Sequence, residues 1–228
     1  MGDEHDREGM GRCGINVDRA FGVSIPAIRT IAKRHRKQHG LALALWDTGY
    51  HEARLLAVFV DDPARVTPEQ MDAWAADFDS WDVCDQAATS LFDKSPHAWD
   101  KVREWSTDER EFVKRGAFAL LAGIAWHDKQ APDDAFLGTL PLIEKGARDP
   151  RNYAKKAVSW ALRHIGKRNA ALNPEAVACA RRILEAAGTG RDPEASAARW
   201  VARDALRELE SDKLRARLGL PPLEEEAS

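Results

Sequence analysis

The chain has 228 residues, of which 44% are hydrophobic, so it is long enough to bury one sizeable core. Its 34 Lys and Arg and its 37 Asp and Glu give a formal net charge of −3, which excludes a globally basic nucleic-acid-binding protein and leaves such a function to local charge. No apolar run approaches the roughly 18 residues of a membrane span, and we expect a soluble cytoplasmic protein without a signal peptide.

The pattern along the chain indicates an all-α fold. Residues 1–15 carry charge and Gly without periodicity and are expected to form a flexible arm. Residues 16–218 are expected to form a single repeat domain, because helical spacing occurs throughout and strand-like alternation nowhere. Residues 219–228 are expected to form a frayed acidic tail. Proline suits the first turn of a helix, and helix starts of this kind are expected at Ser24–Pro26, Asp61–Pro63, Thr67–Pro68, Ser95–Pro96, Pro132–Asp133, Asp149–Pro150, Asn173–Pro174 and Asp192–Pro193.

The segment from Phe78 to Gln86, FDSWDVCDQ, contains the first candidate site. Asp79 or Ser80 is suited to cap a helix whose core face is formed by Val83, Cys84, Ala87, Leu91 and Phe92. Trp81 and Asp85 are four residues apart, hence on one side of that helix and at the edge of its core face. A carboxylate beside an indole is a candidate catalytic group, although an ordinary exposed acid remains the alternative.

The helices also repeat, with a period of about 40–47 residues. Arg148–Pro150 recurs as Arg191–Pro193 after 43 residues, and residues 113–117 resemble residues 154–158 at a shift of 41. A period of roughly 40–47 residues is typical of HEAT and armadillo repeats, which stack antiparallel helix pairs into a right-handed solenoid with a concave binding surface. A compact irregular helical bundle remains the alternative.

The segment 151–168, RNYAKKAVSWALRHIGKR, predicts a basic amphipathic helix with six Lys and Arg and no acid. Its apolar face is formed by Ala154, Val158, Ala161, Leu162 and Ile165. Opposite that face lie Lys156, Trp160, Arg163 and Lys167, and Lys114 and Arg115 extend the pattern in the preceding unit. Because no acid relieves the repulsion between these cations, the stripe favours an anionic ligand such as a sugar-phosphate backbone. A solvated charged face, with the Trp covered by the next repeat, is the alternative.

The remaining reactive side chains do not indicate a metal site or a further catalytic group. Cys13, Cys84 and Cys179 have no metal-ligand spacing, and His127 lies in an expected inter-helix loop without a second His nearby. Five further tryptophans are in phase with apolar neighbours and are expected in the core: Trp46, Trp74, Trp99, Trp105 and Trp200.

Four motifs in order resemble the AlkD-like DNA alkylation repair family, over roughly residues 12–218. SWDVCDQ (80–86) is similar to the family's WWDxxD segment, with Ser80 in place of the first Trp. KKAVSWALR (155–163) is similar to KAxGWxLR, and FGVSIPAIR (21–29) to LGxxxPxxR. EFVKRGAF (111–118) is similar to WxxRxA, with Phe112 in place of Trp. The comparison also leads us to expect that part of the family's N-terminal helix pair is missing.

The resemblance implies a stack of HEAT-like repeats that binds duplex DNA and hydrolyses the glycosidic bond of N3- or N7-alkylated purines in base excision repair. It implies Asp85 as the catalytic carboxylate and Trp81 and Trp160 as the side chains that contact the sugar, all converging on one concave cleft. It also implies a monomer that needs no metal or organic cofactor and is associated with the nucleoid in the cytoplasm. The residues expected to bind DNA are Arg29, Lys114, Arg115, Lys156, Arg163 and Lys167.

Two alternatives remain open at this point. One is a non-catalytic HEAT-repeat protein that recognises distorted or branched DNA through the same basic surface. The other is a protein scaffold without a nucleic-acid partner, which would have an apolar or mixed concave face instead of a basic one.

Overall fold

The computed structural model describes residue 2 and residues 4–222. Over these residues it contains α-helices, one short 3-10 helix and no strand, so the expected all-α fold class is confirmed. The chain folds as two compact units, Met1–Gly123 (unit 1) and Ile124–Ser228 (unit 2). The expected single repeat domain over residues 16–218 stays a prediction.

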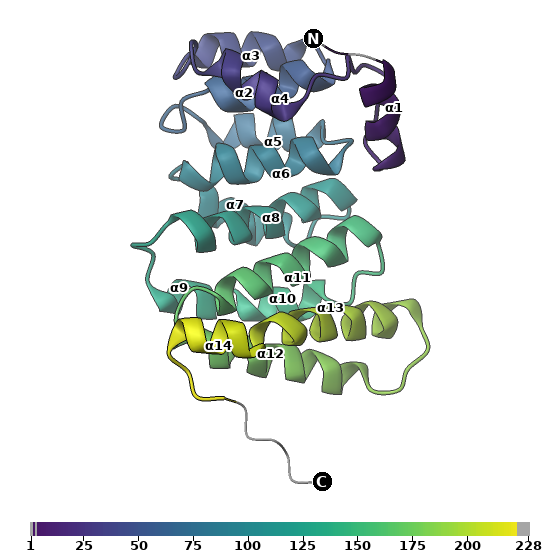
Figure 1. The fold of residues 1–228 in the computed structure, drawn as a ribbon, viewed down its shortest axis with the longest axis vertical. Coiled ribbons are helices and arrows are strands. Elements are labelled where there is room, and N and C mark those ends of the chain that lie inside the picture. Colours follow the sequence, from purple (N-terminus) through teal and green to yellow (C-terminus); the bar gives the residue numbers. More distant parts are fainter. Residues whose placement is uncertain (1, 3, 223–228) are drawn as a thin grey trace. The chain divides into compact units, whose positions relative to one another are not determined.

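Unit 1 arranges its helices in successive layers, α3 with α4, then α5 with α6, then α7 with α8 (Figure 1). Helix α4 packs against α2, α3 and α6. An aromatic core joins the layers, in which the rings of Trp46 and Trp74 stack with their centroids 3.9 Å apart. The helices are α1 (Glu4–Arg12), α2 (Ile25–Ala32), α3 (His39–Asp47), α4 (His51–Val60), α5 (Pro68–Ala76), α6 (Trp81–Ser90), the 3-10 helix η1 (Phe92–Lys94), α7 (Ala98–Trp105) and α8 (Glu111–His127), whose last residues belong to unit 2.

Unit 2 is built around three long helices, α11, α12 and α13, each of which packs against the other two. Gly166 ends α11 at a close approach between them: a Cβ at this position would lie 2.6 Å from Leu209 of α13 and 2.8 Å from Ala176 of α12. The helices of this unit are α9 (Asp133–Leu137), α10 (Leu140–Gly146), α11 (Asn152–Gly166), α12 (Leu172–Ala187), α13 (Pro193–Leu209) and α14 (Asp212–Leu218).

The expected helix starts at Thr67–Pro68 and Asp192–Pro193 are confirmed, whereas the one expected at Asp61–Pro63 is wrong, because residues 63–65 form a turn and α5 begins only at Pro68. Thr67 and Asp192 each accept a hydrogen bond from the backbone three residues on, and Pro68 and Pro193 occupy the first turn that follows. At Ser95–Pro96 the helix begins later, at Ala98, because Pro96 and His97 first form a turn.

The expected flexible arm needs correction, because Glu4–Arg12 forms the helix α1. None of its residues is buried, so packing contributes little to its stability. Ion pairs between Glu4 and Arg7 and between Glu8 and Arg12, at 3.3 and 3.8 Å, support the exposed helix instead. At the other end, residues 223–228 of the expected acidic tail lie outside the described residues.

Candidate functional site

Helix α6 presents the candidate carboxylate at the edge of its buried face. All five residues of the expected core face are buried, at 1% exposure or less. Ser80 is the N-cap, as one of the two expected candidates, and is itself fully buried. Trp81 and Asp85 lie one turn apart and are both half-buried, so each side chain reaches the surface without leaving the helix edge.

Asp85 is held by a bidentate ion pair with Arg115 of α8. The Nε of Arg115 donates to Oδ1 of Asp85 at 2.8 Å, and its Nη2 donates to Oδ2 at 2.6 Å. The Asp85 side chain is only 14% exposed and the Arg115 side chain only 8%. Burial raises the pKa of the Asp85 carboxyl above its ordinary value of 3.8, and the charge and hydrogen bonds of Arg115 offset part of that rise. The geometry therefore fixes the carboxylate in a sheltered position with its orientation set by Arg115.

The start of α6 is tied to the segment that follows α1. The indole Nε1 of Trp81 donates to the carbonyl of Cys13 at 3.0 Å. The backbone N–H of Asn16 donates to the hydroxyl of Ser80 at 2.8 Å, and the Asn16 side chain donates to Asp79 at 2.9 Å. The N-terminal segment thereby restricts the ring of Trp81. The local sequence around Trp81 gave no indication of this contact with a residue 68 positions away.

Two further residues of the expected DNA-binding set lie near this helix or its partner. Arg29 of α2 donates to the side chain of Gln86, the residue after Asp85, at 3.0 Å, and stacks over the ring of Phe59 at 4.9 Å. Lys114 precedes Arg115 on α8 and is half-buried. Unit 1 therefore brings Arg29, Trp81, Asp85 and Arg115 together around α6.

In unit 2 the expected amphipathic helix is α11. All five residues of its expected apolar face are fully buried, whereas Lys156 is exposed and Trp160 is half-buried. The ring of Trp160 meets the ring of His164 edge-on, with centroids 5.9 Å apart. Because Trp160 belongs to unit 2 and Asp85 to unit 1, the expected convergence of Trp81, Asp85 and Trp160 stays a prediction.

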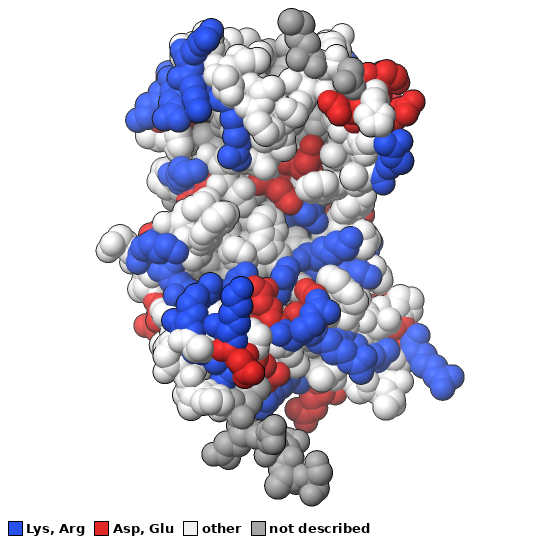
Figure 2. Space-filling view, in the orientation of Figure 1, with Lys and Arg blue, Asp and Glu red and all other residues white. Residues whose placement is uncertain are grey.

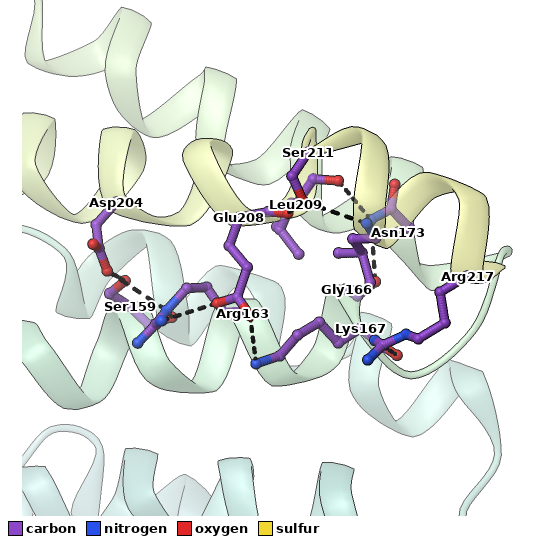
Figure 3. A network of polar contacts seen from close by, with 11 residues as sticks. Ser159, Arg163, Gly166, Lys167, Asn173, Asp204, Glu208, Leu209, Ser211 and Arg217 are labelled. Carbon is purple, nitrogen blue, oxygen red and sulfur yellow. Dashed lines mark hydrogen bonds and ion pairs between the residues drawn. The ribbon is translucent and has the colours of Figure 1, made fainter. Parts of the chain in front are cut away.

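Acids from a neighbouring helix accompany the basic stripe of α11, which the sequence of α11 alone did not indicate. Glu208 of α13 lies 2.9 Å from both Arg163 and Lys167, and Asp204 lies 3.5 Å from Arg163 (Figure 3). Figure 2 likewise shows acidic side chains among the Lys and Arg of this part of the surface. These acids are 41 to 45 residues away in sequence. The repulsion that favoured an anionic ligand is thus relieved in part within the protein.

The ion pairs lower the pKa of the Glu208 carboxyl. Burial acts to raise the pKa of its carboxyl, but the hydrogen bonds and charges of Lys167 and Arg163 more than offset this, and the pKa is lowered from 4.5. Glu208 is therefore a carboxylate at neutral pH, and it competes with any phosphate for the same two cations.

The sequence gave no sign that Trp126 is exposed, and several other residues lie elsewhere than expected. Trp126 is 58% exposed, and His127 is the last residue of α8, not part of a loop. Trp200, expected in the core, is 38% exposed beneath the ammonium group of Lys155, 5.5 Å from its ring. Trp46, Trp74 and Trp105 are buried as expected, whereas Trp99, also expected in the core, is half-buried. Residues 117–125 of α8 are buried on all sides of the helix. Their sequence therefore has no polar face from which the exposure of Trp126 could be predicted.

The described part of the chain contains neither a candidate metal site nor a candidate membrane-spanning helix. Across residue 2 and residues 4–222, no three His, Cys, Asp or Glu side chains are grouped so that they could hold a metal ion. In the same residues, no helix is long and apolar enough to cross a membrane.

Residues 1–209 match the model of a protein family described as "DNA alkylation repair enzyme". The chain is also similar in fold to a solved structure described as "a new family of proteins related to the HEAT-like repeat DNA glycosylases with affinity for branched DNA structures". The two chains are 21% identical, the similarity covers 97% of this chain and 92% of the other, and the TM-score is 0.73. No curated protein matches the chain. The expected HEAT-like repeat fold is confirmed.

Proposed function

Since this chain belongs to the DNA alkylation repair enzyme family, we propose that it is a DNA N-glycosylase that removes N3- or N7-alkylated purines from duplex DNA. It acts as a monomer, on DNA of the nucleoid in the cytoplasm, and uses no metal or organic cofactor. The observation that carries the proposal is the sheltered carboxylate of Asp85, held in one orientation by Arg115 and lying one helical turn from Trp81.

Hydrolysis of the glycosidic bond of an alkylated purine mainly requires electrostatic stabilisation of the transition state by the protein. A purine alkylated at N3 or N7 is a cation, so it leaves with the electron pair of the glycosidic bond and needs no general acid. Positive charge then develops on the deoxyribose, and a fixed carboxylate nearby lowers the energy of that transition state. Asp85 takes this role and also orients the water that attacks C1′ of the sugar, whose proton passes to the carboxylate or to solvent.

Arg115 is assigned a positioning role at Asp85 in addition to its expected contact with DNA. Its guanidinium binds both carboxylate oxygens, so the negative charge of Asp85 is matched until DNA arrives. A backbone phosphate entering the site competes with Asp85 for the same guanidinium, because planar bidentate binding suits phosphate as well as carboxylate. Binding of DNA then leaves the carboxylate less neutralised at the point where the sugar becomes positive.

Trp81 and Trp160 are assigned to the deoxyribose. The face of an indole attracts positive charge, and this attraction grows as the oxocarbenium ion forms, so it accelerates the reaction instead of strengthening ground-state binding alone. The hydrogen bond from Trp81 to the carbonyl of Cys13 limits the rotation of its ring, which favours such a contact.

Binding of duplex DNA is assigned to Arg29, Lys114, Arg115, Lys156, Arg163 and Lys167. We expect Glu208→Gln to strengthen it by roughly three- to ten-fold at low salt and to steepen its salt dependence, because Arg163 and Lys167 lose their competing carboxylate. Fluorescence anisotropy with a labelled duplex between 50 and 300 mM salt, roughly the range over which phosphate contacts weaken, measures both quantities.

Glu210→Gln is the matched control for this substitution. It removes the same charge from the end of α13, but Glu210 pairs with Arg181, 2.7 Å away, which is outside the expected DNA-binding set. Equal effects of the two substitutions would mean that net charge alone matters and that Arg163 and Lys167 do not contact phosphate.

Incubation of the purified chain with methylated duplex DNA tests the proposed activity directly. The expected products are free 7-methylguanine and 3-methyladenine, separated by chromatography, together with abasic sites in the DNA. Absence of released base at enzyme concentrations above that of the substrate would refute the glycosylase proposal.

A non-catalytic protein for branched DNA is the second candidate, and two observations favour it. The charge of Asp85 is matched by Arg115, as a structural ion pair would be. The similar solved structure is also that of a protein with affinity for branched DNA. Competition between a four-way junction and a linear duplex of the same sequence decides this: preference for the junction without base release supports this candidate over the glycosylase.

A further inference from the structure

The end of α8 exposes an aromatic side chain that has no part in the site around Asp85. Trp126 has the largest exposed fraction among the large hydrophobic side chains of the described residues, 58%. An indole left open to water forgoes the stabilisation that burial of a large ring would give, and such exposed apolar groups often mark binding sites. Trp126 lies in unit 2, which also contains α11.

Trp126 is one of three rings that together form what we call the aromatic surface: Trp126, His127 and His164. The rings of Trp126 and His127 are stacked, with centroids 4.8 Å apart and planes inclined by 21°. His164 of α11 meets Trp126 edge-on at 6.0 Å, with planes inclined by 66°. Two helices therefore contribute rings that contact the Trp126 ring, while Trp126 stays 58% exposed.

The charges near the aromatic surface suit a polyanion. The pKa of His164 is lowered to about 4 by burial and by the positive charges of Lys167 and Arg163, so its ring is a neutral aromatic at neutral pH. Helix α11 itself contains Lys and Arg but no acid; Asp204 and Glu208 of α13 pair with Arg163 and Lys167, whereas Lys156 is exposed. Cations beside an exposed ring are the combination with which proteins bind the backbone and the bases of single strands.

We propose that the aromatic surface of Trp126, His127 and His164 is a stacking site for an unpaired nucleobase of DNA, a proposal that rests on the DNA-binding part of the proposed function. Inside a duplex both faces of a base are covered by its neighbours, so an open indole has no base face to contact. A base in a single-stranded arm or gap exposes its faces and stacks on the ring with little dependence on its identity. The site therefore gives the chain a preference for DNA that contains unpaired bases.

Binding of four labelled probes by the full chain tests this. The probes are a single strand, a forked duplex with unpaired arms, a blunt duplex of the same sequence, and a single strand whose sugars carry no bases. We expect Trp126→Ala to weaken binding of the single strand and the fork by about ten-fold, the loss typical for one stacked base, and to leave the blunt duplex within about two-fold. Wild type is expected to bind the base-free strand as weakly as Trp126→Ala binds the normal strand.

Trp200→Ala is the matched control, because it removes another exposed tryptophan of unit 2, on α13. It should bind all four probes like wild type, and Trp126→Phe should retain most of the affinity for the fork. Equal binding of normal and base-free strands by wild type would overturn the proposal without any substitution. If Trp126→Ala binds every probe like wild type, stacking is refuted while DNA binding stands; if wild type binds none of the probes, both fall.

Discussion

Asp85→Asn is expected to lower the single-turnover rate of alkylpurine release by about 10²–10³-fold, the cost typical of losing one well-placed electrostatic stabiliser. The substitution keeps the size of the side chain and one oxygen that can accept from Arg115, but it removes the charge that faces the developing oxocarbenium ion. Affinity for duplex DNA should remain near that of wild type, or rise slightly, since Arg115 loses its competing carboxylate and becomes available to phosphate.

The measurement uses excess protein over methylated duplex, so that chemistry and not product release determines the rate. Asp79→Asn is the control: Asp79 is an exposed acid at the start of the same helix whose contact is with the Asn16 side chain. Circular dichroism establishes that each variant is folded at the assay temperature, because Asp85→Asn weakens a sheltered ion pair. If Asp85→Asn released base as fast as wild type, Asp85 would have no part in the chemistry.

The parts of the fold that the sequence predicted are those set by local periodicity. In α6 and α11 the apolar residues recur every three or four positions, and that phase alone placed Val83 and Cys84, or Val158 and Leu162, in the core. Helix starts were predictable for the same reason, because an N-cap and the proline that follows it act within one turn.

Contacts between segments far apart in the sequence could not be predicted from the periodicity of a single helix. The sequence of α11 shows a basic stripe without acids, yet Glu208 from α13 neutralises part of it. Two helices of a repeat can exchange charges across their interface while each appears unbalanced alone. In the same way, spacing placed Trp81 and Asp85 on one side of α6 but gave no indication that Arg115, 30 residues later, would bind Asp85.

The sequence did not distinguish exposed from buried tryptophans where the apolar pattern of a helix is interrupted or ends. Trp126 follows a run of buried small and aliphatic residues in α8, and the helix turns it outward one residue before it ends. Trp200 is in phase with apolar neighbours but is 38% exposed, with the ammonium group of Lys155 5.5 Å from its ring. Aromatic residues have both roles, and burial is decided by which neighbouring helix is present.

Arg115→Met should have the largest effect on stability, a decrease of about 3 kcal/mol in the free energy of unfolding, because it leaves the sheltered Asp85 carboxylate without its partner. Replacing both residues, with Asp85→Leu and Arg115→Met together, should cost less than the sum of the single changes, since no buried charge is then left unpaired. Urea unfolding of the four proteins of this cycle measures the coupling, and additive losses would mean that the ion pair does not act as a unit.

The same substitution separates a positioning role of Arg115 from a merely structural one. Burial raises the pKa of Asp85 and Arg115 offsets part of that rise, so removing Arg115 raises the pKa further. Catalysis needs the ionised carboxylate, and the ionised fraction grows with pH, so the acid limb of the pH–rate profile of base release should move to higher pH in Arg115→Met. A profile that keeps its position while the rate falls at every pH would show that Arg115 supports the fold or DNA binding without tuning Asp85.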